Sequence, residues 1–201
     1  MANYAFIDVQ NTDSTTKQLL NFRIDWMRLY NFLKKNKHCD KVFFYTGADE
    51  KDTESIDLLN NLEEIGCEMR SKILHVFKNK DRDIEVICPK CGNQFIERVN
   101  MGYNHKSNCD VDLTVDAMQL LGNDNVFYLF TGDGDFEYLI KTAIKNKTKI
   151  VLVSSTKKIR IGSRYFTSRF STKLRELLRV YPNVVRFDNI NNYKFKIEKN
   201  D

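Results

Sequence analysis

Acidic side chains that could hold divalent cations occur in three separated segments of the sequence. They are Asp8 with the nearby amide of Asn11, then Asp110, Asp112 and Asp116, and finally Asp133 and Asp135. Each alone has an ordinary explanation as a turn former or a helix N-cap. Carboxylates gathered at neutral pH repel one another, however, and persist only if they are protonated or neutralised by cations. Because oxygen ligands select hard ions, the set together indicates a Mg²⁺ or Mn²⁺ site.

The chemistry that such a site favours is phosphoryl transfer. Two ions roughly 4 Å apart stabilise both the attacking and the leaving oxygen of an in-line displacement, so that no protein nucleophile is needed. The three histidines, His38, His75 and His105, are too scattered in sequence for a catalytic triad to be inferred.

A phosphatase of the haloacid-dehalogenase type is a weaker alternative. The run TGDGDF at 131–136 is similar to the late motif of those enzymes. Their chemistry also requires an Asp two positions after the nucleophilic one, and here Asp8 is followed at that position by Gln10.

The elements that must position these acids follow from hydrophobic patterning. Short runs rich in β-branched and aromatic residues alternate with helical periodicity, which predicts an α/β domain with a mostly parallel sheet. Strands are expected over 4–7, 41–45, 68–77, 125–130 and 149–153, with an edge strand at 184–187. Helices are expected from after the first strand to about 37, and over 53–65, 111–121, 135–145 and 171–180. Gly66 occupies a helix C-cap position.

Two of the expected strands end in acids, FID at Asp8 and FYLFTGD at Asp133. Ligands of parallel sheets bind beyond the carboxyl ends of the strands, where the strand order reverses. If the two strands are neighbours, Asp8 and Asp133 converge there. Asp110 begins the central helix and is the first expected ligand from it, followed by Asp116 and then Asp112, which share one helix face.

Three motifs resemble the NYN domain (LabA-like) family of the PIN-like nuclease superfamily. They are FIDVQN at 6–11, CDVDLTVDAM at 109–118 and TGDGDFEYLI at 131–140, with a weaker match at KIVLVSS (149–155) and Ser171. The resemblance implies a Rossmannoid three-layer sandwich with strand order 3-2-1-4-5, helices on both faces, and metal-dependent hydrolysis of RNA phosphodiesters. Because several family members act as binders, a non-catalytic RNA-binding or regulatory module of the same fold is the alternative.

The resemblance also assigns roles to particular residues. The family's acidic positions fall on Asp8, Asp110, Asp133 and Asp135, its first-motif asparagine on Asn11, and an acidic helix position on Asp116. Two departures occur, Val9 in place of a usual Gly and Ser107-Asn108 in place of a usual Lys-Gly. Neither removes a carboxylate, although both bear on how a substrate approaches.

Basic residues concentrate between 157 and 179, with Glu176 as the one acid in that stretch. They are Lys157, Lys158, Arg160, Arg164, Arg169, Lys173, Arg175 and Arg179, interleaved with Tyr165, Phe166 and Phe170. Such a stretch fits a phosphate backbone, with aromatic rings to stack on bases, and its first six basic residues are the expected nucleic-acid contacts. The alternative is a solvated basic helix whose aromatic side chains face the core.

The segment 78–108 is expected to be a polar, irregular insert that contains a rubredoxin-like knuckle, Cys88-Pro89-Lys90-Cys91-Gly92. With His105 and Cys109 the spacing is C-x2-C-x13-H-x3-C, which could close a tetrahedral structural zinc site. Such a metal would supply the folding energy that a small insert lacks. His75 or a second subunit could replace Cys109 as a ligand, and a metal-free turn is the alternative. Cys39 and Cys67 are expected to be ordinary buried thiols.

Composition bounds the remaining possibilities. With 201 residues, 42% hydrophobic and 29% charged, the sequence suits a single globular domain over 1–201, with a tail at 189–201 that frays. The first residues lack a secretory pattern, no run is long enough to span a membrane, and five irregularly placed cysteines favour a reducing compartment. We therefore expect a cytoplasmic protein that binds nucleic acid, RNA in the first instance, has no membrane partner, and could form a homo-oligomer.

Overall fold

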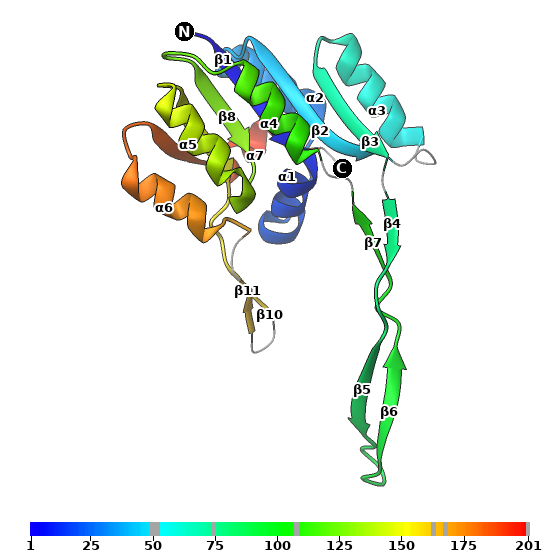
Figure 1. Cartoon of the computed structure of the whole chain (residues 1–201). Coiled ribbons are helices and arrows are strands. Elements are labelled where there is room, and N and C mark those ends of the chain that lie inside the picture. Colours follow the sequence, from blue (N-terminus) through cyan, green and yellow to red (C-terminus); the bar gives the residue numbers. More distant parts are fainter. Residues whose placement is uncertain (49–52, 74, 107–108, 162–163, 167–168, 200–201) are drawn as a thin grey trace.

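A six-stranded, fully parallel sheet with the order β12-β9-β8-β1-β2-β3 forms the body of the protein (Figure 1). The computed structural model describes residues 1–48, 53–73, 75–106, 109–161, 164–166 and 169–199. The strands of this sheet are β1 (Asn3–Asp8), β2 (Lys41–Ala48), β3 (Glu68–Ile73), β8 (Val126–Phe130), β9 (Lys149–Ser154) and β12 (Val185–Asn189). The strand order predicted for the first five strands is confirmed, and the expected edge strand adds a sixth beside β9.

Helices cover both faces of the sheet, so the expected three-layer sandwich is confirmed. They are α1 (Val9–Thr15), the π-helix η1 (Thr16–Leu20), α2 (Trp26–Asn36), α3 (Thr53–Glu64), α4 (Asp110–Gln119), the 3-10 helix η2 (Gly134–Phe136), α5 (Glu137–Lys145), α6 (Thr172–Val180), the 3-10 helix η3 (Ile190–Tyr193) and α7 (Lys194–Ile197). Within the described residues, no helix has the length and apolar character needed to cross a membrane.

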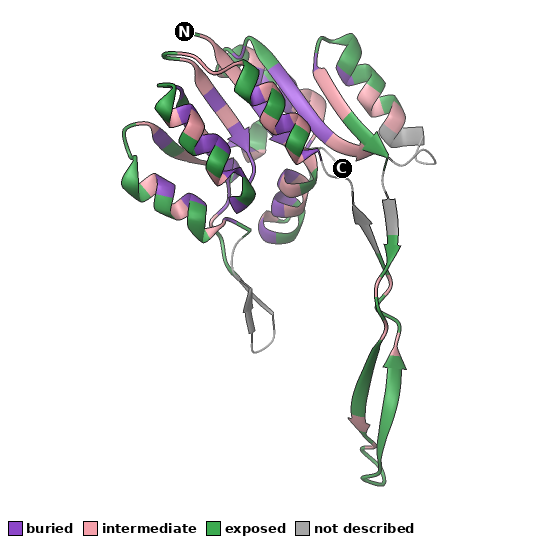
Figure 2. Cartoon of the chain, viewed as in Figure 1, coloured by how far each residue is buried: buried purple, intermediate pink, exposed green. Residues whose placement is uncertain are grey.

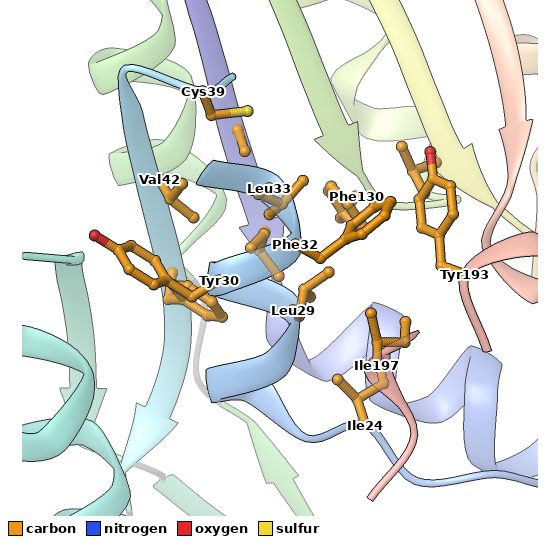
Figure 3. Close-up of a cluster of buried hydrophobic side chains, with 14 of the residues drawn as sticks. Ile24, Leu29, Tyr30, Phe32, Leu33, Cys39, Val42, Phe130, Tyr193 and Ile197 are labelled. Carbon is orange, nitrogen blue, oxygen red and sulfur yellow. The ribbon is translucent and has the colours of Figure 1, made fainter. Parts of the chain in front are cut away.

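The strand β1 is buried on both faces, which explains why its sequence is continuously apolar. Ala5 and Ile7 belong to one hydrophobic core, which packs the sheet against α2, α3 and α7. Figure 3 shows this core, where side chains of α2 meet those of the sheet and of the C-terminal segment. Phe6 points to the opposite face, into a second core formed with α4, α5 and α6. The two cores fix β1 and its neighbours at the centre of the molecule.

The prediction of one continuous helical segment between the first strand and residue 37 is wrong. The chain instead forms α1 and η1, breaks at Asn21, and resumes as α2. Asn21 adopts a left-handed conformation (φ 57°), which asparagine tolerates better than most residues. Asp25 then starts α2 as an N-cap, because its carboxylate accepts a hydrogen bond from the Arg28 backbone N–H at 3.0 Å.

The prediction that the insert is irregular is also wrong, because the described residues from 75 to 106 form a regular antiparallel arm. β4 (His75–Lys78) pairs with β7 (Tyr103–Lys106), and β5 (Arg82–Ile87) pairs with β6 (Gln94–Val99). The predicted third strand therefore ends at Ile73 in the main sheet. Charged residues occupy both faces of this solvated ribbon, which conceals its period-2 pattern. Figures 1 and 2 show the arm extending from the body and exposed along most of its length.

A second, shorter hairpin leaves the same edge of the sheet as the arm (Figure 1). It consists of β10 (Ile159–Ile161) and β11 (Arg164–Phe166). This edge carries the carboxyl ends of the parallel strands, where the acidic motifs also lie.

The prediction of a fraying tail over 189–201 is wrong for its described part. Ile190, Tyr193 and Ile197 are buried in the core beside α2. The Asp25 backbone N–H donates to the Ile197 carbonyl at 2.7 Å, which ties the tail to the start of α2. The three buried residues recur at i, i+3 and i+7, a helical period that the surrounding Asn and Lys residues obscure.

We expect the substitution Ile197→Ala to lower the free energy of unfolding by about 2–5 kcal/mol, because it opens a cavity at a fully buried site. Urea denaturation of purified protein measures this. The matched control is Phe195→Ala on the same helix, where the side chain is 94% exposed and the expected change is near zero. Equal effects of the two substitutions would show that the tail contributes no specific packing.

Candidate metal and nucleic-acid site

The candidate site lies where two central parallel strands end together. β1 pairs with β8, and the register matches Ile7 with Phe130. Asp8, the next residue of β1, therefore lies beside Thr131, whose hydroxyl donates to the Asp8 carboxylate at 3.2 Å. The Gly132 backbone N–H donates to the Asn11 side-chain oxygen at 2.9 Å. Hydrogen bonds thus join the two strand ends directly.

The helix starts next to these strand ends hold two of the carboxylates in place. Asp8 is the N-cap of α1 and accepts a hydrogen bond from the Asn11 backbone N–H at 3.0 Å. Asp133 is the N-cap of η2 and accepts from the Asp135 backbone N–H at 2.9 Å. The N-cap interpretation is therefore correct for Asp133, whereas Asp8, for which a turn was the ordinary explanation, is an N-cap as well, and Asp110 follows the N-cap Cys109. Capping orients the carboxylates of Asp8 and Asp133 at the edge of the sheet.

Electrostatic repulsion connects four of the acids into one group, the acidic cluster of Asp8, Asp110, Asp133 and Asp135. Burial, together with the charges of Asp110 and Asp133, raises the pKa of Asp8 to about 6, although the hydrogen bonds from Asn11 and Thr131 act to lower it. Burial also raises the pKa of Asp110, as do the charges of Asp133 and Asp135. These groups perturb one another as carboxylates at a shared site do.

The other two acids of the central helix are paired with cations from β3. Asp112 forms an ion pair with Lys72 at 2.5 Å. Asp116 forms one with Arg70 at 3.0 Å and also accepts a hydrogen bond from the Tyr45 hydroxyl at 3.1 Å. These contacts attach α4 to the β2–β3 side of the sheet. The structure therefore brings Asp110 into the acidic cluster, while Asp112 and Asp116 are neutralised elsewhere.

A cavity of about 370 Å³ opens beside the acidic cluster and has both signs of charge in its wall. Its lining residues are Asn11, Gly132, Asp133, Gly134, Asp135, Arg169, Ser171 and Lys173. A second hollow of about 210 Å³ shares Asp135 with it and is bordered by Asp110 and Phe136. The arrangement can accommodate an anionic group next to the acids, with cationic side chains in contact.

Two glycines that the sequence reasoning passed over bring the basic residues to this cavity. A Cβ at Gly132 would lie 2.2 Å from the Arg169 carbonyl oxygen, and one at Gly134 would lie 2.3 Å from the Ser171 hydroxyl. The Ser171 backbone N–H donates to the Gly132 carbonyl at 2.9 Å. The segment before α6 therefore packs directly on the loop after β8. The glycines of the TGDGD run are the sequence signal for this close approach.

The expected nucleic-acid contacts are distributed differently from a simple basic stripe. Arg169 and Lys173 line the cavity, and Lys157 and Lys158 are exposed after β9. Arg160 and Arg164 lie in the β10–β11 hairpin, but their side chains, like those of Tyr165 and Phe166, are outside the described part of the structure.

The remaining residues of the basic segment make contacts within the body of the protein. Phe170 is buried, packs against Phe187, and carries Arg175 over its ring at 5.4 Å. Arg179 forms an ion pair with Glu176 at 2.6 Å. The expectation that Phe170 stacks on bases is therefore replaced by its alternative, an aromatic side chain that faces the core.

The structure does not bring together the four expected zinc ligands. Cys88 and Cys91 lie in the turn that joins β5 to β6, whereas His105 lies in β7 at the other end of the arm. Cys109 is buried in the body, where its thiol donates to the Thr46 carbonyl at 3.4 Å. Across the described ranges, no three His, Cys, Asp or Glu side chains are close enough to hold one ion.

The expectation of ordinary buried thiols at Cys39 and Cys67 is confirmed. Burial raises the pKa of each to about 12, which leaves them protonated and unreactive at neutral pH.

We expect Asp8→Asn to stabilise the metal-free protein at pH 7. The pKa of Asp8 in the folded protein lies above its usual value of 3.8, so the parent loses stability as pH rises from about 4 to about 6. An asparagine cannot ionise and keeps the N-cap. Thermal unfolding in chelator from pH 4 to pH 8 should show the variant's advantage growing over this range.

The matched control is Asp124→Asn, at an exposed position with φ 63° that asparagine tolerates. Its difference from the parent should not change between pH 4 and pH 8 in the way that Asp8→Asn does. An Asp8→Asn variant no more stable than the parent at pH 7 would contradict the electrostatic account of the cluster.

Comparison with known proteins agrees with this architecture. The model of the family described as the NYN domain matches residues 4–172. The "Low amplitude and bright protein LabA" of Synechococcus elongatus is 25% identical over 167 residues, which cover 82% of this chain and 80% of that protein. The crystal structure of VPA0982 from Vibrio parahaemolyticus, a protein of unknown function, superimposes with a TM-score of 0.60. It covers 94% of this chain and 92% of its own at 17% identity, a likeness of fold alone. The chain therefore belongs to the NYN domain family, whose fold is that of the PIN-like nucleases.

Proposed function

We propose that this protein is a metal-dependent ribonuclease that hydrolyses RNA phosphodiester bonds at the acidic cluster. The observation that carries the proposal is the meeting of opposite charges at one cavity, where Asp133 and Asp135 face the same space as Arg169 and Lys173. Carboxylates alone would attract cations, and the cationic side chains alone would attract anions. A site with both suits a phosphate together with a divalent ion. Membership of the NYN family supports this reading.

The chemistry of the donor set fits Mg²⁺ or Mn²⁺. All four members of the acidic cluster offer carboxylate oxygens, the ligands that these hard ions prefer. The raised pKa values of Asp8 and Asp110 reflect burial and mutual repulsion, and a bound cation would relieve the repulsion. Asp8, Asp110 and Asp133 would hold the metal, with the exposed Asp135 at the rim. Among the described residues no three such side chains already lie close enough to hold one ion, so these carboxylates would draw together when the ion binds. When bound, such ions supply positive charge that offsets the charge developing on the phosphate oxygens.

The protein's own groups orient the reactants around this cluster. Thr131 and Asn11 fix the two strand ends through their hydrogen bonds, so that Asp8 and Asp133 keep their relative positions. Asp116 is a positioning residue in this proposal, since its contacts with Arg70 and Tyr45 hold the helix that presents Asp110. Removing Asp116 would therefore disturb the site indirectly.

Arg169 and Lys173 would bind the phosphate of the substrate, and Lys157 and Lys158 would contact further phosphates along the RNA strand. The Arg169 side chain also donates to the Gln18 side-chain oxygen at 2.8 Å, which restricts its freedom before a substrate arrives. The β10–β11 hairpin projects from the same edge of the sheet (Figure 1). A flexible single strand of RNA can follow such a path, with its phosphates on the basic side chains.

We expect Asp8→Asn, Asp110→Asn and Asp133→Asn each to lower Mn²⁺-dependent cleavage of labelled RNA by about 10²–10³-fold, because each removes part of the electrostatic stabilisation of the transition state. The assay compares assorted RNAs and DNAs with and without Mn²⁺. Asp124→Asn, far from the cluster, should cleave like the parent.

The triple Asn variant excludes a contaminating nuclease. If it cleaved as fast as the parent, the catalytic assignment would be incorrect. RNA binding without cleavage in any divalent ion would identify the protein as a non-catalytic RNA-binding module of the same fold.

We expect the double substitution Arg169→Gln/Lys173→Gln to weaken RNA binding and to flatten its salt dependence, by a slope of roughly 0.7 per lost phosphate contact on single strands. Fluorescence anisotropy in an Asp133→Asn background separates binding from cleavage. The control Arg175→Gln/Arg179→Gln removes the same charge from the same segment, at residues engaged with Phe170 and Glu176. If the salt dependence of RNA binding had the same slope in the two variants, Arg169 and Lys173 would contribute only through the overall charge of the protein.

A further inference from the structure

The tip of the arm is a turn that presents two thiols to solvent. The Cys88 backbone N–H donates to the Asn93 carbonyl, and the Gly92 N–H donates to the Cys88 carbonyl, both at 2.9 Å. Gly92 adopts φ 75°, a conformation that favours glycine. Backbone N–H groups of Cys91 and Lys90 donate to the Cys88 sulfur. A turn of this kind can clasp Zn²⁺ with two thiolates, which is half of a tetrahedral site.

Within the described residues, the same chain offers nothing near the tip to complete the site. The other cysteines, Cys39, Cys67 and Cys109, are buried in the body. The strands β4 and β7, which carry two of the histidines, form the base of the arm, and Figure 1 shows the whole of β5 and β6 between them and the tip. The ligands that close the site must come from another molecule.

The arm also exposes a face with four apolar side chains that a partner would cover. The register pairs Val86 with Phe95, Ile84 with Glu97 and Arg82 with Val99, so these six side chains, four apolar and two of opposite charge, share one face of the β5–β6 ribbon. Ile84 is 45% exposed and Phe95 is 49% exposed. A two-stranded ribbon alone is only marginally stable in water, so covering this face would stabilise the arm.

We propose that two copies of this chain join through their arms, with Cys88 and Cys91 of each copy holding one shared Zn²⁺ and these two ribbon faces packed together. A second copy is the occupant that supplies an identical pair of thiols on a two-fold axis and completes a closed four-sulfur site. The four thiols release their protons to solvent when the metal binds. Four thiolates around Zn²⁺ leave a net negative charge, and Lys90 of each copy offsets it. The closed site is structural, and its existence does not depend on nuclease activity.

The test is the zinc content and the mass of protein purified with reductant and without chelator. We expect one zinc ion per two chains by elemental analysis, and the mass of a dimer by sedimentation equilibrium. A chelator should remove the zinc and shift the protein toward the monomer mass. The variant Cys88→Ser/Cys91→Ser should be monomeric and zinc-free. The matched control Cys109→Ser keeps a donor to the Thr46 carbonyl and should retain both zinc and dimer.

Cobalt substitution tests the ligand set on the unaltered chain and does not rely on a variant that folds. Titration with Co²⁺ should give the visible absorption of a tetrahedral four-thiolate site, saturating at one ion per two chains. One zinc ion per monomer, a zinc-free dimer, or a zinc-free Cys88–Cys91 disulfide in the purified protein would each overturn the proposal.

Discussion

Repulsion between partly buried carboxylates at the ends of β1 and β8 is the constraint around which the structure is arranged. Burial and neighbouring charge together raise the pKa of Asp8 to about 6, so the unliganded fold keeps this group at some cost in stability. Two hydrogen bonds, from the Thr131 hydroxyl to Asp8 and from the Gly132 backbone N–H to the Asn11 side-chain oxygen, hold the strand ends together against that repulsion. The two hydrophobic cores on either face of β1 hold the strand rigidly, so that the carboxylates stay close together despite their repulsion.

The helix α4 shows how one element divides its charges between structure and the site. Its first acid faces the cluster, while Asp112 and Asp116 are neutralised by Lys72 and Arg70 of β3. Without those cations the helix would add two more negative charges beside an already strained group. The ion pairs therefore anchor the helix and also limit the repulsion that the cluster must tolerate.

Much of the sheet and the convergence of Asp8 with Asp133 could be predicted from the sequence, because buried strands are continuously apolar and the ends of parallel strands meet at one edge. The arm could not, because charges on both of its faces hide the alternation. The buried tail was missed because Ile190, Tyr193 and Ile197 are dispersed among Asn and Lys. The spacing of Cys88, Cys91, His105 and Cys109 predicted a single zinc site wrongly, because the length of the β5–β6 ribbon separates the first two residues from the last two. The division of acids within α4 depends on cations of β3, which no local pattern reveals.

The close packing of Gly132 against residue 169 has a consequence for how this protein can change over evolutionary time. The contact is made by the backbone carbonyl of Arg169, whereas its side chain is exposed and lines the cavity. A substitution at 132 meets main-chain atoms and disturbs the architecture, but a substitution at 169 alters what the cavity wall presents and removes one exposed hydrogen bond to Gln18. Under the proposed function, substrate preference can therefore drift at this position while the frame around the acids stays intact, so that the same carboxylates meet a succession of different nucleic acids.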